Sequence, residues 1–382
     1  MRIAMVYDAV YPYVKGGAER YFAEIAKRLA PRHEVHLFGM KYWSGPADRQ
    51  QADGVWLHGV CPPVALYRHG RRSLLAALWF TCWLPWSLMR QGRFDIINVN
   101  SIPYFPLFPL RLLAALTGAT FVVTWLEYWR GHWQQYLGWG ATLAGWIEWL
   151  ATRVSPHAIT ISEHTRQGIL SAGLRAERIA LVPPGIDWPH LQAVVPAQET
   201  VDILYVGRLI KDKRVDLLLE ALDLVRQRRP EIRCLIVGDG IERPSLTALA
   251  ERLKLNDNVR FAGFLPESDD VYRLMKSSRL FAFLSEREGF GIVVIEAAAC
   301  GLPVVVVDAP NNAAADLVRS GQFGLISPPD KDRVAGHILA LLDNEAQRGV
   351  MREKGLACSR NYDWARIAQE TERAYQAALS RG

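Results

Sequence analysis

The sequence predicts an α/β protein with two doubly wound domains that face each other across a cleft. Short β-branched runs alternate with amphipathic helical patterns almost from end to end of its 382 residues. Several runs, such as PVVVV at 303–307, show no polar alternation. Runs of this kind are typical of parallel strands covered by helices on both faces. The length also fits two domains of ordinary size.

The pattern predicts six strands in each half of the chain. In order they are Arg2–Asp8, Glu34–Gly39, Phe94–Asn98, Thr120–Thr124, Ala158–Ser162, Ile179–Pro183, Asp202–Gly207, Arg233–Gly238, Val259–Ala262, Leu280–Leu284, Pro303–Val307 and Gly324–Ile326.

The segment Val182–Glu199 is rich in Pro and Gly and has no sustained period, which indicates an interdomain linker. We therefore expect a Rossmann-like domain over 1–187 and a second over 188–360. A final helix over 361–382 is expected to cross back onto the first domain. Ligands of such domains bind outside the carboxyl ends of the strands, so the expected site is the cleft.

Composition narrows the possible functions. The net charge of +6 is spread along the chain, which fits an anionic ligand or an anionic membrane surface. It is too diffuse for nucleic acid, and no nucleic-acid-binding motif occurs. The five cysteines contain no C-x-x-C pair, which argues against a disulfide framework and a zinc site. The start MRIAMVYD is typical of a strand and not of a signal peptide, so a cytoplasmic protein is expected.

The first domain has two apolar features that leave alternatives open. Ser73–Met89 carries no charge, contains Pro85 and has basic residues on both sides. It is predicted as a buried helix, and a surface helix resting in a bilayer is the alternative. Twelve of the thirteen tryptophans precede residue 190. Core packing, an acceptor pocket in which rings stack on sugars, and a lipid interface would each use them.

Glycine motifs exclude two nucleotide-binding classes. The sequence has neither the G-x-G-x-x-G fingerprint of dinucleotide-binding domains nor a P-loop. Gly16 and Gly17 end the first loop and open a helix. They would allow the backbone to approach an anion at the helix N-terminus, or they form a plain tight turn.

The segment VGRLIKDK places cations after a predicted strand. The strand ends at Gly207, and Arg208 and Lys213 follow before the next helix. Two cations past the carboxyl end of a strand would hold a diphosphate and neutralise a leaving nucleotide. Lys211 and Arg214 fit the alternative of solvated loop charges better.

The segment SEREGFGIVVIEAAACG places two carboxylates eight residues apart. Glu288 lies in a predicted loop, where Gly289 and Gly291 allow a sharp turn that directs backbone N–H groups toward a ligand. Glu296 lies in the second turn of the following helix, from which a carboxylate can accept from a vicinal diol. The alternative to ligand binding is an acid that complements the helix dipole at the N-terminus. This alternative would explain Glu288 but not Glu296, which lies within an otherwise apolar helix.

Taken together, these segments resemble the retaining, nucleotide-sugar-dependent glycosyltransferases of family 4, which have the GT-B fold. The resemblance covers essentially the whole chain. It includes the Gly16-Gly17 loop, ISEHTRQGI, VPPGID, VGRLIKDK, VGDG, FAGFL and the Glu-x7-Glu motif, in this order.

The resemblance implies roles for particular residues. Arg208 and Lys213 would hold the diphosphate, Glu288 would face the transferred sugar, and Glu296 would bind the ribose. The remaining residues implied in donor binding are Gly17, Gly240, Phe264, Leu265, Gly289, Phe290, Gly291, Ile292 and Val293. Those implied in acceptor binding are Gly16, Gly17, Glu127 and Trp129.

No metal or cofactor is implied, because this fold uses no DxD metal site. The DKD sequence at Asp330–Asp332 is predicted as a helix cap. One position departs from the family. After the strand at 120–124, members usually carry a His two residues past a Thr. Here Leu126 of VVTWLEYW occupies that position. Leucine can donate no hydrogen bond to a sugar.

The sequence as a whole therefore predicts a retaining hexosyltransferase. Its acceptor is expected to be a lipid-linked glycan in exopolysaccharide or O-antigen synthesis, with the protein on the cytoplasmic face of a membrane. Two alternatives stay open. One is a degenerate protein that binds a nucleotide sugar but transfers it weakly or not at all, because of Leu126. The other is a transferase that acts on soluble sugars.

Overall fold

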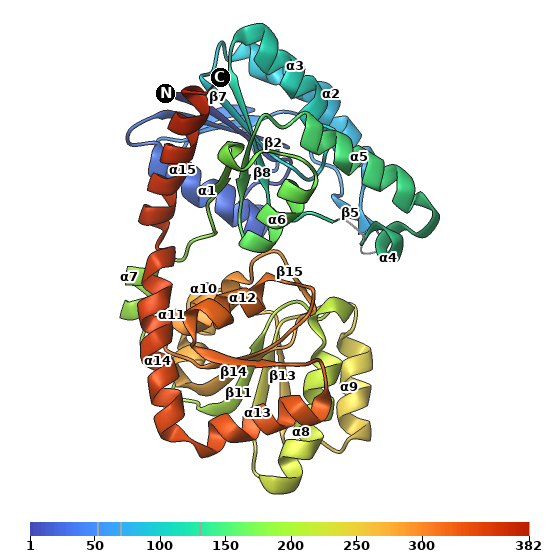
Figure 1. Ribbon diagram of the computed structural model, residues 1–382, viewed down its shortest axis with the longest axis vertical. Coiled ribbons are helices and arrows are strands. Elements are labelled where there is room, and N and C mark those ends of the chain that lie inside the picture. The colour runs from blue at the N-terminus through green and yellow to red at the C-terminus, as the bar shows by residue number, and fades with distance from the viewer. Residues whose placement is uncertain (52, 69–70, 130–131, 382) are drawn as a thin grey trace. The chain divides into compact units, whose positions relative to one another are not determined.

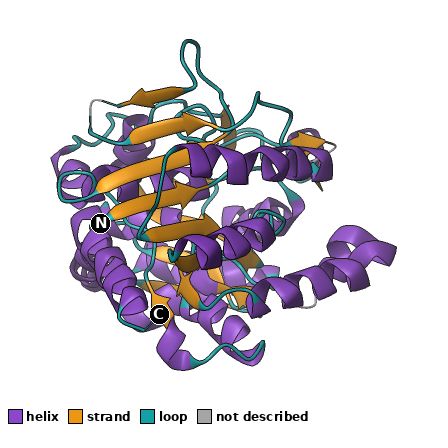
Figure 2. Ribbon diagram, turned by 90° about the horizontal axis from the view of Figure 1, so that it is seen from above, coloured by secondary structure: helices purple, strands orange, loops and turns teal. Residues whose placement is uncertain are grey.

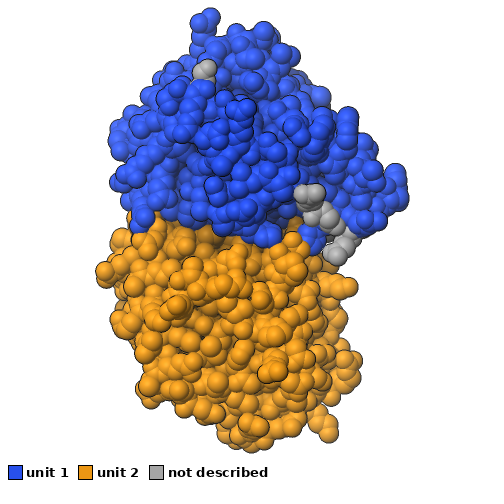
Figure 3. Space-filling model, in the orientation of Figure 1, with its two compact units in different colours: residues 1–184, 364–382 blue, residues 185–363 orange. Residues whose placement is uncertain are grey.

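The structure is a computed structural model that describes residues 1–51, 53–68, 71–129 and 132–381. The chain forms two units, coloured separately in Figure 3. Unit 1 comprises Met1–Pro184 and Trp364–Gly382, and unit 2 comprises Gly185–Asp363. The junctions fall at 184/185 and 363/364, where the sequence suggested 187/188 and 360/361. Each unit has its own sheet and core.

Unit 1 is built on a sheet with the strand order β10-β9-β8-β7-β1-β2-β4-β3, parallel except for β3 against β4. The strands are β1 Arg2–Val6, β2 Glu34–Gly39, β3 Asp48–Gln50, β4 Trp56–Gly59, β7 Ile96–Asn100, β8 Thr120–Trp125, β9 His157–Thr160 and β10 Ile179–Leu181, with a separate hairpin of β5 Tyr67–Arg68 and β6 Arg71–Arg72.

The helices of unit 1 lie on both faces of this sheet (Figures 1 and 2). They are α1 Gly17–Leu29, α2 Leu74–Arg90, α3 Leu107–Thr117, α4 Trp133–Leu137, α5 Ala141–Arg153, α6 Glu163–Ser171 and α15 Trp364–Leu379, with 3₁₀ turns η1 Gly138–Gly140 and η2 Ala176–Arg178. The crossover from β1 to β2 runs one way along the sheet, and the later crossovers from β4 to β7, β8 and β9 run the other way. Because crossovers between parallel strands are right-handed, α1 lies on one face and α2, α3 and α5 lie on the other.

The C-terminal helix α15 packs against α1 and completes the core of unit 1. Trp364 is fully buried beside Tyr21, whose ring centroid lies 6.2 Å away. Tyr375 accepts a 2.8 Å hydrogen bond at its hydroxyl from Asn98 of β7. The final helix therefore belongs to the first sheet by both apolar and polar contacts.

Helix α2 corrects the prediction of a buried helix over 73–89. Ser73 caps its first turn by accepting a hydrogen bond from the Ala76 N–H. Only one side of the helix is buried, including Phe80, Leu84 and Leu88. The other side is exposed, although it is equally apolar. No helix in the described part of the chain is long and apolar enough to span a membrane.

A buried pair of histidines joins β2 to β4 inside unit 1. His36 Nδ1 lies 2.9 Å from His58 Nε2, and the outer nitrogens contact Glu34 at 3.0 Å and Asp48 at 2.9 Å. Both rings are buried, and burial is the main reason that both histidine pKa values lie below their ordinary range. Since the unfolded chain binds protons more readily at these sites, acid should favour unfolding.

We therefore expect the free energy of unfolding to fall as the pH drops below about 6.5, where histidines of an unfolded chain take up protons. Thermal unfolding followed from mildly alkaline to mildly acidic pH would measure this. A His36→Gln/His58→Gln double variant should show a flatter dependence of Tm on pH. Equal slopes in the two proteins would contradict the role of the pair.

Unit 2 has a six-stranded parallel sheet with the order β13-β12-β11-β14-β16-β18. Its strands are β11 Val201–Val206, β12 Cys234–Val237, β13 Val259–Gly263, β14 Ser278–Phe283, β16 Val304–Val307 and β18 Gly324–Ser327, with a two-stranded ladder of β15 Arg287–Glu288 and β17 Asn311–Asn312. Its helices are α7 Trp188–Ala193, α8 Val215–Arg228, α9 Arg243–Arg252, α10 Ser268–Ser277, α11 Ile292–Ala299, α12 Ala313–Gly321, α13 Lys331–Asp343 and α14 Glu345–Ser359, with 3₁₀ turns η3 Lys211–Lys213 and η4 Arg360–Tyr362.

All twelve predicted strands form, with ends shifted by at most two residues, and the two doubly wound folds are confirmed. The four valines of β16 are fully buried, as expected for a central strand covered on both faces. The short strands β3, β4, β5, β6, β15 and β17 were not predicted.

Candidate active site

The strand order of unit 2 reverses direction between β11 and β14. At such a switch point the loops after the two strands leave toward opposite faces of the sheet and open a crevice for ligands. The loop after β11 carries Arg208 and Lys213, and the loop after β14 carries Glu288. Two of the predicted site segments therefore meet at the position where this fold binds ligands.

Lys213 and Glu288 form an ion pair at this switch point, although 75 positions separate them in the sequence. Both side chains are largely buried. The Lys213 ammonium also lies 5.3 Å from the centroid of the Phe283 ring. The pair therefore presents one cation and one carboxylate in a site of reduced solvent exposure.

Backbone contacts hold the two loops together. The Glu286 N–H donates to the Asp212 carbonyl at 2.9 Å, and the Ser285 hydroxyl lies 3.2 Å from the same carbonyl and 2.9 Å from the Arg287 carbonyl. Arg214 pairs with Glu286 and with Asp216, so it is not the solvated charge that was expected. Because these bonds cross between the loops, they fix the position of the Lys213–Glu288 pair.

The other cations of the first loop differ in exposure. Arg208 is exposed, and its carbonyl accepts a 3.2 Å hydrogen bond from the Tyr205 hydroxyl. Lys211 is exposed at the start of η3, as expected for a solvated charge. Arg208 thus has a side chain available to a ligand next to the strand end.

The Gly-Phe-Gly turn brings the chain into helix α11. Gly291 is the N-cap residue with φ +90°, a conformation that favours glycine, and a Cβ here would lie 2.7 Å from the Ala314 Cβ. The Phe290 side chain is buried against Tyr362, with ring centroids 5.6 Å apart. Only the backbone of Phe290 is therefore available to a ligand. The N–H groups of Ile292 and Val293 lie in the first turn, where a helix offers unpaired donors to an anion.

Glu296 faces a different environment from Glu288. It is buried in α11, and its Oε1 accepts a 2.9 Å hydrogen bond from the Tyr272 hydroxyl. This bond fixes the carboxylate without neutralising its charge. The arrangement fits an acceptor of hydroxyl hydrogen bonds better than a dipole-complementing acid at the helix start.

The loops after β12 and β13 lie beside this crevice. Gly240 approaches the Leu209 backbone so closely that a Cβ would lie 2.2 Å from the Leu209 carbonyl oxygen. The sequence suggested a ligand contact for Gly240, and loop packing alone already requires glycine there. Phe264 is exposed directly after β13, and Leu265 is half-buried. An exposed aromatic ring at a strand end suits stacking on a base.

Gly238 supplies a test of this loop packing. Its φ is +135°, and a Cβ would lie 1.9 Å from the Gly207 carbonyl oxygen. Gly238→Ala should lower the free energy of unfolding by about 2–5 kcal/mol, from backbone strain and overpacking. Urea-induced unfolding would measure the change. Gly17→Ala is the control, because no atom lies within 4 Å of a Cβ at Gly17. Similar stabilities of the two variants would contradict the packing argument.

In unit 1, Gly16 lies next to the buried carboxylate of Glu19, which the nearby charge of Asp8 influences. Gly16 is the N-cap residue of α1, and a Cβ there would lie 2.3 Å from Glu19 Oε2. Glu19 accepts a 3.2 Å hydrogen bond from the Tyr7 hydroxyl. Asp8, two residues after β1, pairs with Arg72 through Oδ1, while its buried Oδ2 has no hydrogen-bond partner among the described residues. Burial raises the pKa of both carboxyl groups.

Asp8 was not among the predicted site residues. The available signal was an acid at the carboxyl end of an otherwise apolar strand, MRIAMVYD. A buried carboxylate with a raised pKa and an unsatisfied oxygen is a candidate to accept a proton or a hydroxyl hydrogen bond. Asp8, Glu19 and Arg72 therefore extend the candidate site of unit 1.

The segment after β8 carries the remaining predicted acceptor residues. Leu126, Glu127 and Trp129 are half-buried. The Trp129 N–H donates to the buried Glu148 at 2.7 Å, and Trp133 Nε1 donates to the same carboxylate at 3.0 Å. The Trp129 and Trp133 rings lie 4.8 Å apart. Trp129 thus belongs to an aromatic cluster that one buried carboxylate holds in place.

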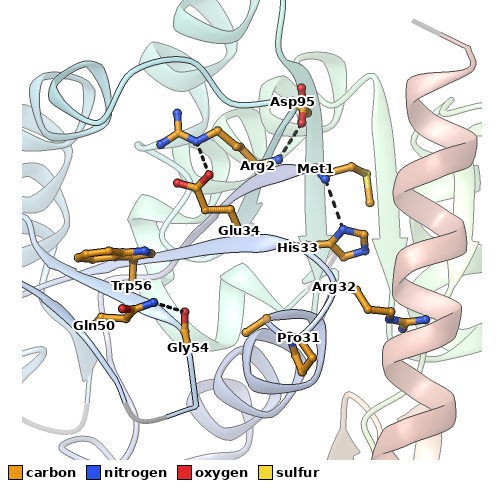
Figure 4. A pocket seen from close by; sticks show the side chains of 11 residues that line it. Met1, Arg2, Pro31, Arg32, His33, Glu34, Gln50, Gly54, Trp56 and Asp95 are labelled. Atoms are coloured by element: carbon orange, nitrogen blue, oxygen red, sulfur yellow. Dashed lines mark hydrogen bonds and ion pairs between the residues drawn. The ribbon is translucent and has the colours of Figure 1, made fainter.

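Described residues of unit 1 line at least two cavities. One of about 570 Å³ lies at the amino ends of β1 and β2 (Figure 4). Its polar groups engage one another, with Arg2 Nε 3.0 Å from Glu34 and the Arg2 N–H 2.7 Å from Asp95. It lies at the sheet edge opposite to Asp8, so we do not assign the active site to it. The second, about 480 Å³, is lined by Tyr128 and Trp133 among others.

Among the described residues, no three His, Cys, Asp or Glu side chains are arranged so that they could hold a metal ion. Asp330 of the DKD sequence caps α13 by accepting a 3.0 Å hydrogen bond from the Arg333 N–H, as predicted.

Comparison with known families divides the chain near its linker. Residues 15–188 match "Glycosyltransferase Family 4", and residues 189–357 match "Glycosyl transferases group 1". The chain spans about half the length of the curated relatives it matches. One of them, O-antigen chain mannosyltransferase B from Escherichia coli, is 33% identical over 178 residues, which are 45% of each chain.

Solved structures match over nearly the whole length. Sucrose-phosphate synthase from Thermosynechococcus elongatus superposes with a TM-score of 0.80 at 18% identity, covering 100% of both chains. HepE from Anabaena, solved in complex with UDP and glucose, gives 0.74 at 20% identity and covers 98% of both. These similarities confirm the predicted fold class.

Proposed function

Since the chain belongs to family 4 of the glycosyltransferases and has their GT-B fold, we propose that it transfers a hexose from a nucleoside diphosphate sugar to a glycan acceptor. The observation that carries the proposal is the Lys213–Glu288 pair at the switch point of unit 2. It places a cation for a diphosphate and a carboxylate for a sugar beside the first turn of α11. Glu296 lies four residues further along the same helix.

The donor would be held by groups of unit 2. Arg208 and Lys213 would bind the diphosphate, and the first-turn N–H groups of α11 would add donors. Glu288 would bind the hexose, Glu296 the ribose, and the segment at Phe264 and Leu265 the base. HepE, solved with UDP and glucose, supports a nucleoside diphosphate donor for this fold. The E. coli relative supports mannose as the hexose.

The reaction follows from these contacts. The bond between the anomeric carbon and the diphosphate breaks, and its electron pair leaves with the nucleoside diphosphate. Arg208 and Lys213 stabilise that developing charge, so no metal is needed. The acceptor hydroxyl attacks from the same face, which retains the configuration, and its proton passes to the leaving diphosphate. Retention and front-side attack come from the family resemblance.

The acceptor would be bound by unit 1, through Gly16, Gly17, Glu127 and Trp129. We propose a lipid-linked glycan of exopolysaccharide or O-antigen synthesis, with the protein on the cytoplasmic face of a membrane. The tryptophan-rich surface of unit 1 and the O-antigen relative support this choice. A soluble sugar acceptor would be indicated if transfer needed no lipid.

A screen of nucleotide sugars tests the proposal. Each donor is added to the purified protein, and thermal shift and release of nucleoside diphosphate are measured with and without a membrane lipid extract. We expect a shift with one donor, and release that depends on lipid and persists with EDTA. If no donor caused a thermal shift or a release of nucleoside diphosphate, the proposal would be refuted.

Leu126 favours a second candidate, a protein that binds the donor but transfers little. A shift without release in the same screen would support it. If the missing His only lowers activity, Leu126→His should raise transfer about fivefold, the effect of one added hydrogen bond of about 1 kcal/mol. The rate of product formation would measure this. Loss of activity would instead make Leu126 an adaptation to this enzyme's own substrate.

A further inference from the structure

Exposed apolar side chains are concentrated on three helices of unit 1. The described chain exposes 21 large apolar residues, and 13 of them lie on α2, α3, and η1 with α5. They are Leu74, Leu75, Leu78, Trp79, Trp83, Trp86 and Met89 on α2, Leu112 and Leu116 on α3, and Trp139, Leu143, Trp146 and Trp149 on η1 and α5. We call this set the aromatic layer. Exposed apolar side chains that gather on neighbouring helices mark an interaction site.

The three helices belong to one layer of the fold. They follow β4, β7 and β8, and these crossovers run in the same direction along the sheet. Right-handed connections therefore put all three on the same face, opposite α1. Figure 1 shows α2, α3 and α5 along one flank of the unit and α1 with α15 along the other. Their outward sides thus belong to one surface.

Each outward side follows the helical period. On η1 and α5, Trp139, Leu143, Trp146 and Trp149 are three or four residues apart, which puts them in one stripe. On α3, Leu112 and Leu116 have the same spacing. The inward sides bury other residues, such as Ala151 of α5. Helices α2 and α3 are therefore apolar on both sides, whereas α5 buries Glu148 and Thr152 beside Ala151 and keeps its apolar stripe outside. The outer side of all three helices needs a cover.

Charge on this surface has one sign. The sequences of α2 and α3 contain no Asp or Glu, and the one acid of α5, Glu148, is buried. Arg90 and Arg153 end α2 and α5 and are exposed. The Arg153 guanidinium lies 4.9 Å from the Trp149 ring centroid, so a cation sits at the edge of the aromatic stripe. Apolar helices rimmed by arginine are complementary to an anionic lipid surface.

We propose that the aromatic layer binds the interface of an anionic phospholipid bilayer, with tryptophan and leucine among the headgroups and arginine on the lipid phosphates. Tryptophan prefers this depth because its ring is amphipathic. The inference deepens the proposed function and rests on its membrane-linked acceptor. It names the part of unit 1 that would bring the protein to that acceptor.

The test uses the whole chain and vesicles of phosphatidylglycerol, with phosphatidylcholine vesicles for comparison. Co-sedimentation gives the partition coefficient, and tryptophan emission reports transfer of the rings from water. The variant Leu75→Glu/Leu116→Glu/Trp146→Glu changes one residue on each helix. The control Val195→Glu/Ile241→Glu/Val350→Glu adds the same charge to unit 2. All six residues are between 56% and 77% exposed, so both variants should fold, and Tm checks this.

We expect the wild type to bind phosphatidylglycerol vesicles with a blue shift, more weakly at high salt and on phosphatidylcholine. The layer variant should lose about tenfold or more in partitioning, and the control variant should lose much less. Equal losses in both variants, or no binding by the wild type, would overturn the proposal. The proposal would also be overturned if the wild type and the control variant were dimers and the layer variant a monomer. Vesicle binding needs no donor, and donor binding needs no vesicles, so failure here is distinct from failure of the transferase function.

Discussion

Lys213→Ala is expected to lower the rate of sugar transfer by about 10²–10³-fold while the fold stays intact. This is the range for removing one group that stabilises charge developing on a leaving group. The assay is release of nucleoside diphosphate from the donor that the screen identifies. Thermal unfolding and the affinity for the nucleoside diphosphate, measured on the same sample, separate binding from turnover.

The reason for so large an effect is the position of Lys213 at the switch point. The loops after β11 and β14 are joined there by the Glu286–Asp212 backbone hydrogen bond and by the Arg214–Glu286 ion pair. Without a donor, the Lys213 ammonium pairs with Glu288. When a donor binds, the diphosphate would compete for this ammonium, and Glu288 would become available to the sugar. Without Lys213, no ammonium at this position would stabilise the charge that develops on the leaving diphosphate.

The loop supplies its own control. Lys211 lies two residues earlier in the same 3₁₀ turn but is exposed. Lys211→Ala removes the same charge from the sequence, so it tests whether net charge near the site is sufficient. We expect less than about a twofold change for Lys211→Ala, since exposed charges are screened by solvent and salt. Near-normal transfer by Lys213→Ala would contradict its role on the diphosphate.

The fold was predictable because its strands are apolar on both faces. The run PVVVV has few alternatives to a central parallel strand, and β16 is fully buried. The short strands β3 and β4 were missed because Asp48–Gln50 and the His58 of β4 do not look like a core. Their polar groups are satisfied by one another, through the Glu34–His36–His58–Asp48 series of contacts. Sequence patterns do not reveal such long-range pairing.

Helix α2 shows a different limit. Its composition is equally apolar on the side that packs on the sheet and on the side that is exposed, so periodicity gave no direction. Burial was the simpler expectation, and it is wrong for half of the helix. Only the position of α2 in the outer layer, set by the strand order, identifies the side that lacks a cover.

The candidate site was predictable where a motif carries its own geometry. The Gly-Phe-Gly turn and Glu296 follow one another along the chain, so their relation could be inferred from spacing. The Lys213–Glu288 pair depends on which strands are neighbours, and the sequence placed both residues at strand ends but could not pair them. Asp8 depends on Arg72, 64 positions away, and on burial, so only the structure identifies it.

Glu296→Ala is expected to abolish discrimination between a nucleoside diphosphate and its 2′-deoxy analogue. A hydrogen bond between a hydroxyl and a charged acceptor contributes about 1.5–3 kcal/mol, which corresponds to roughly 10–150-fold in affinity. The wild type should therefore prefer the ribose form by about this factor. Calorimetric titration of both analogues with both proteins completes a double cycle that isolates the hydroxyl–carboxylate contact.

The cycle is needed because Glu296 has a second role. Its carboxylate accepts the 2.9 Å hydrogen bond from Tyr272, so Glu296→Ala also changes the packing of α10 against α11. A loss of packing would weaken the binding of both analogues alike, whereas loss of the ribose contact weakens only the ribose form. Tyr272→Phe separates the two effects, since it removes the same internal bond and keeps the carboxylate. We expect Tyr272→Phe to retain most of the discrimination. If Glu296→Ala weakens both analogues equally, the carboxylate holds the helix and does not read the ribose.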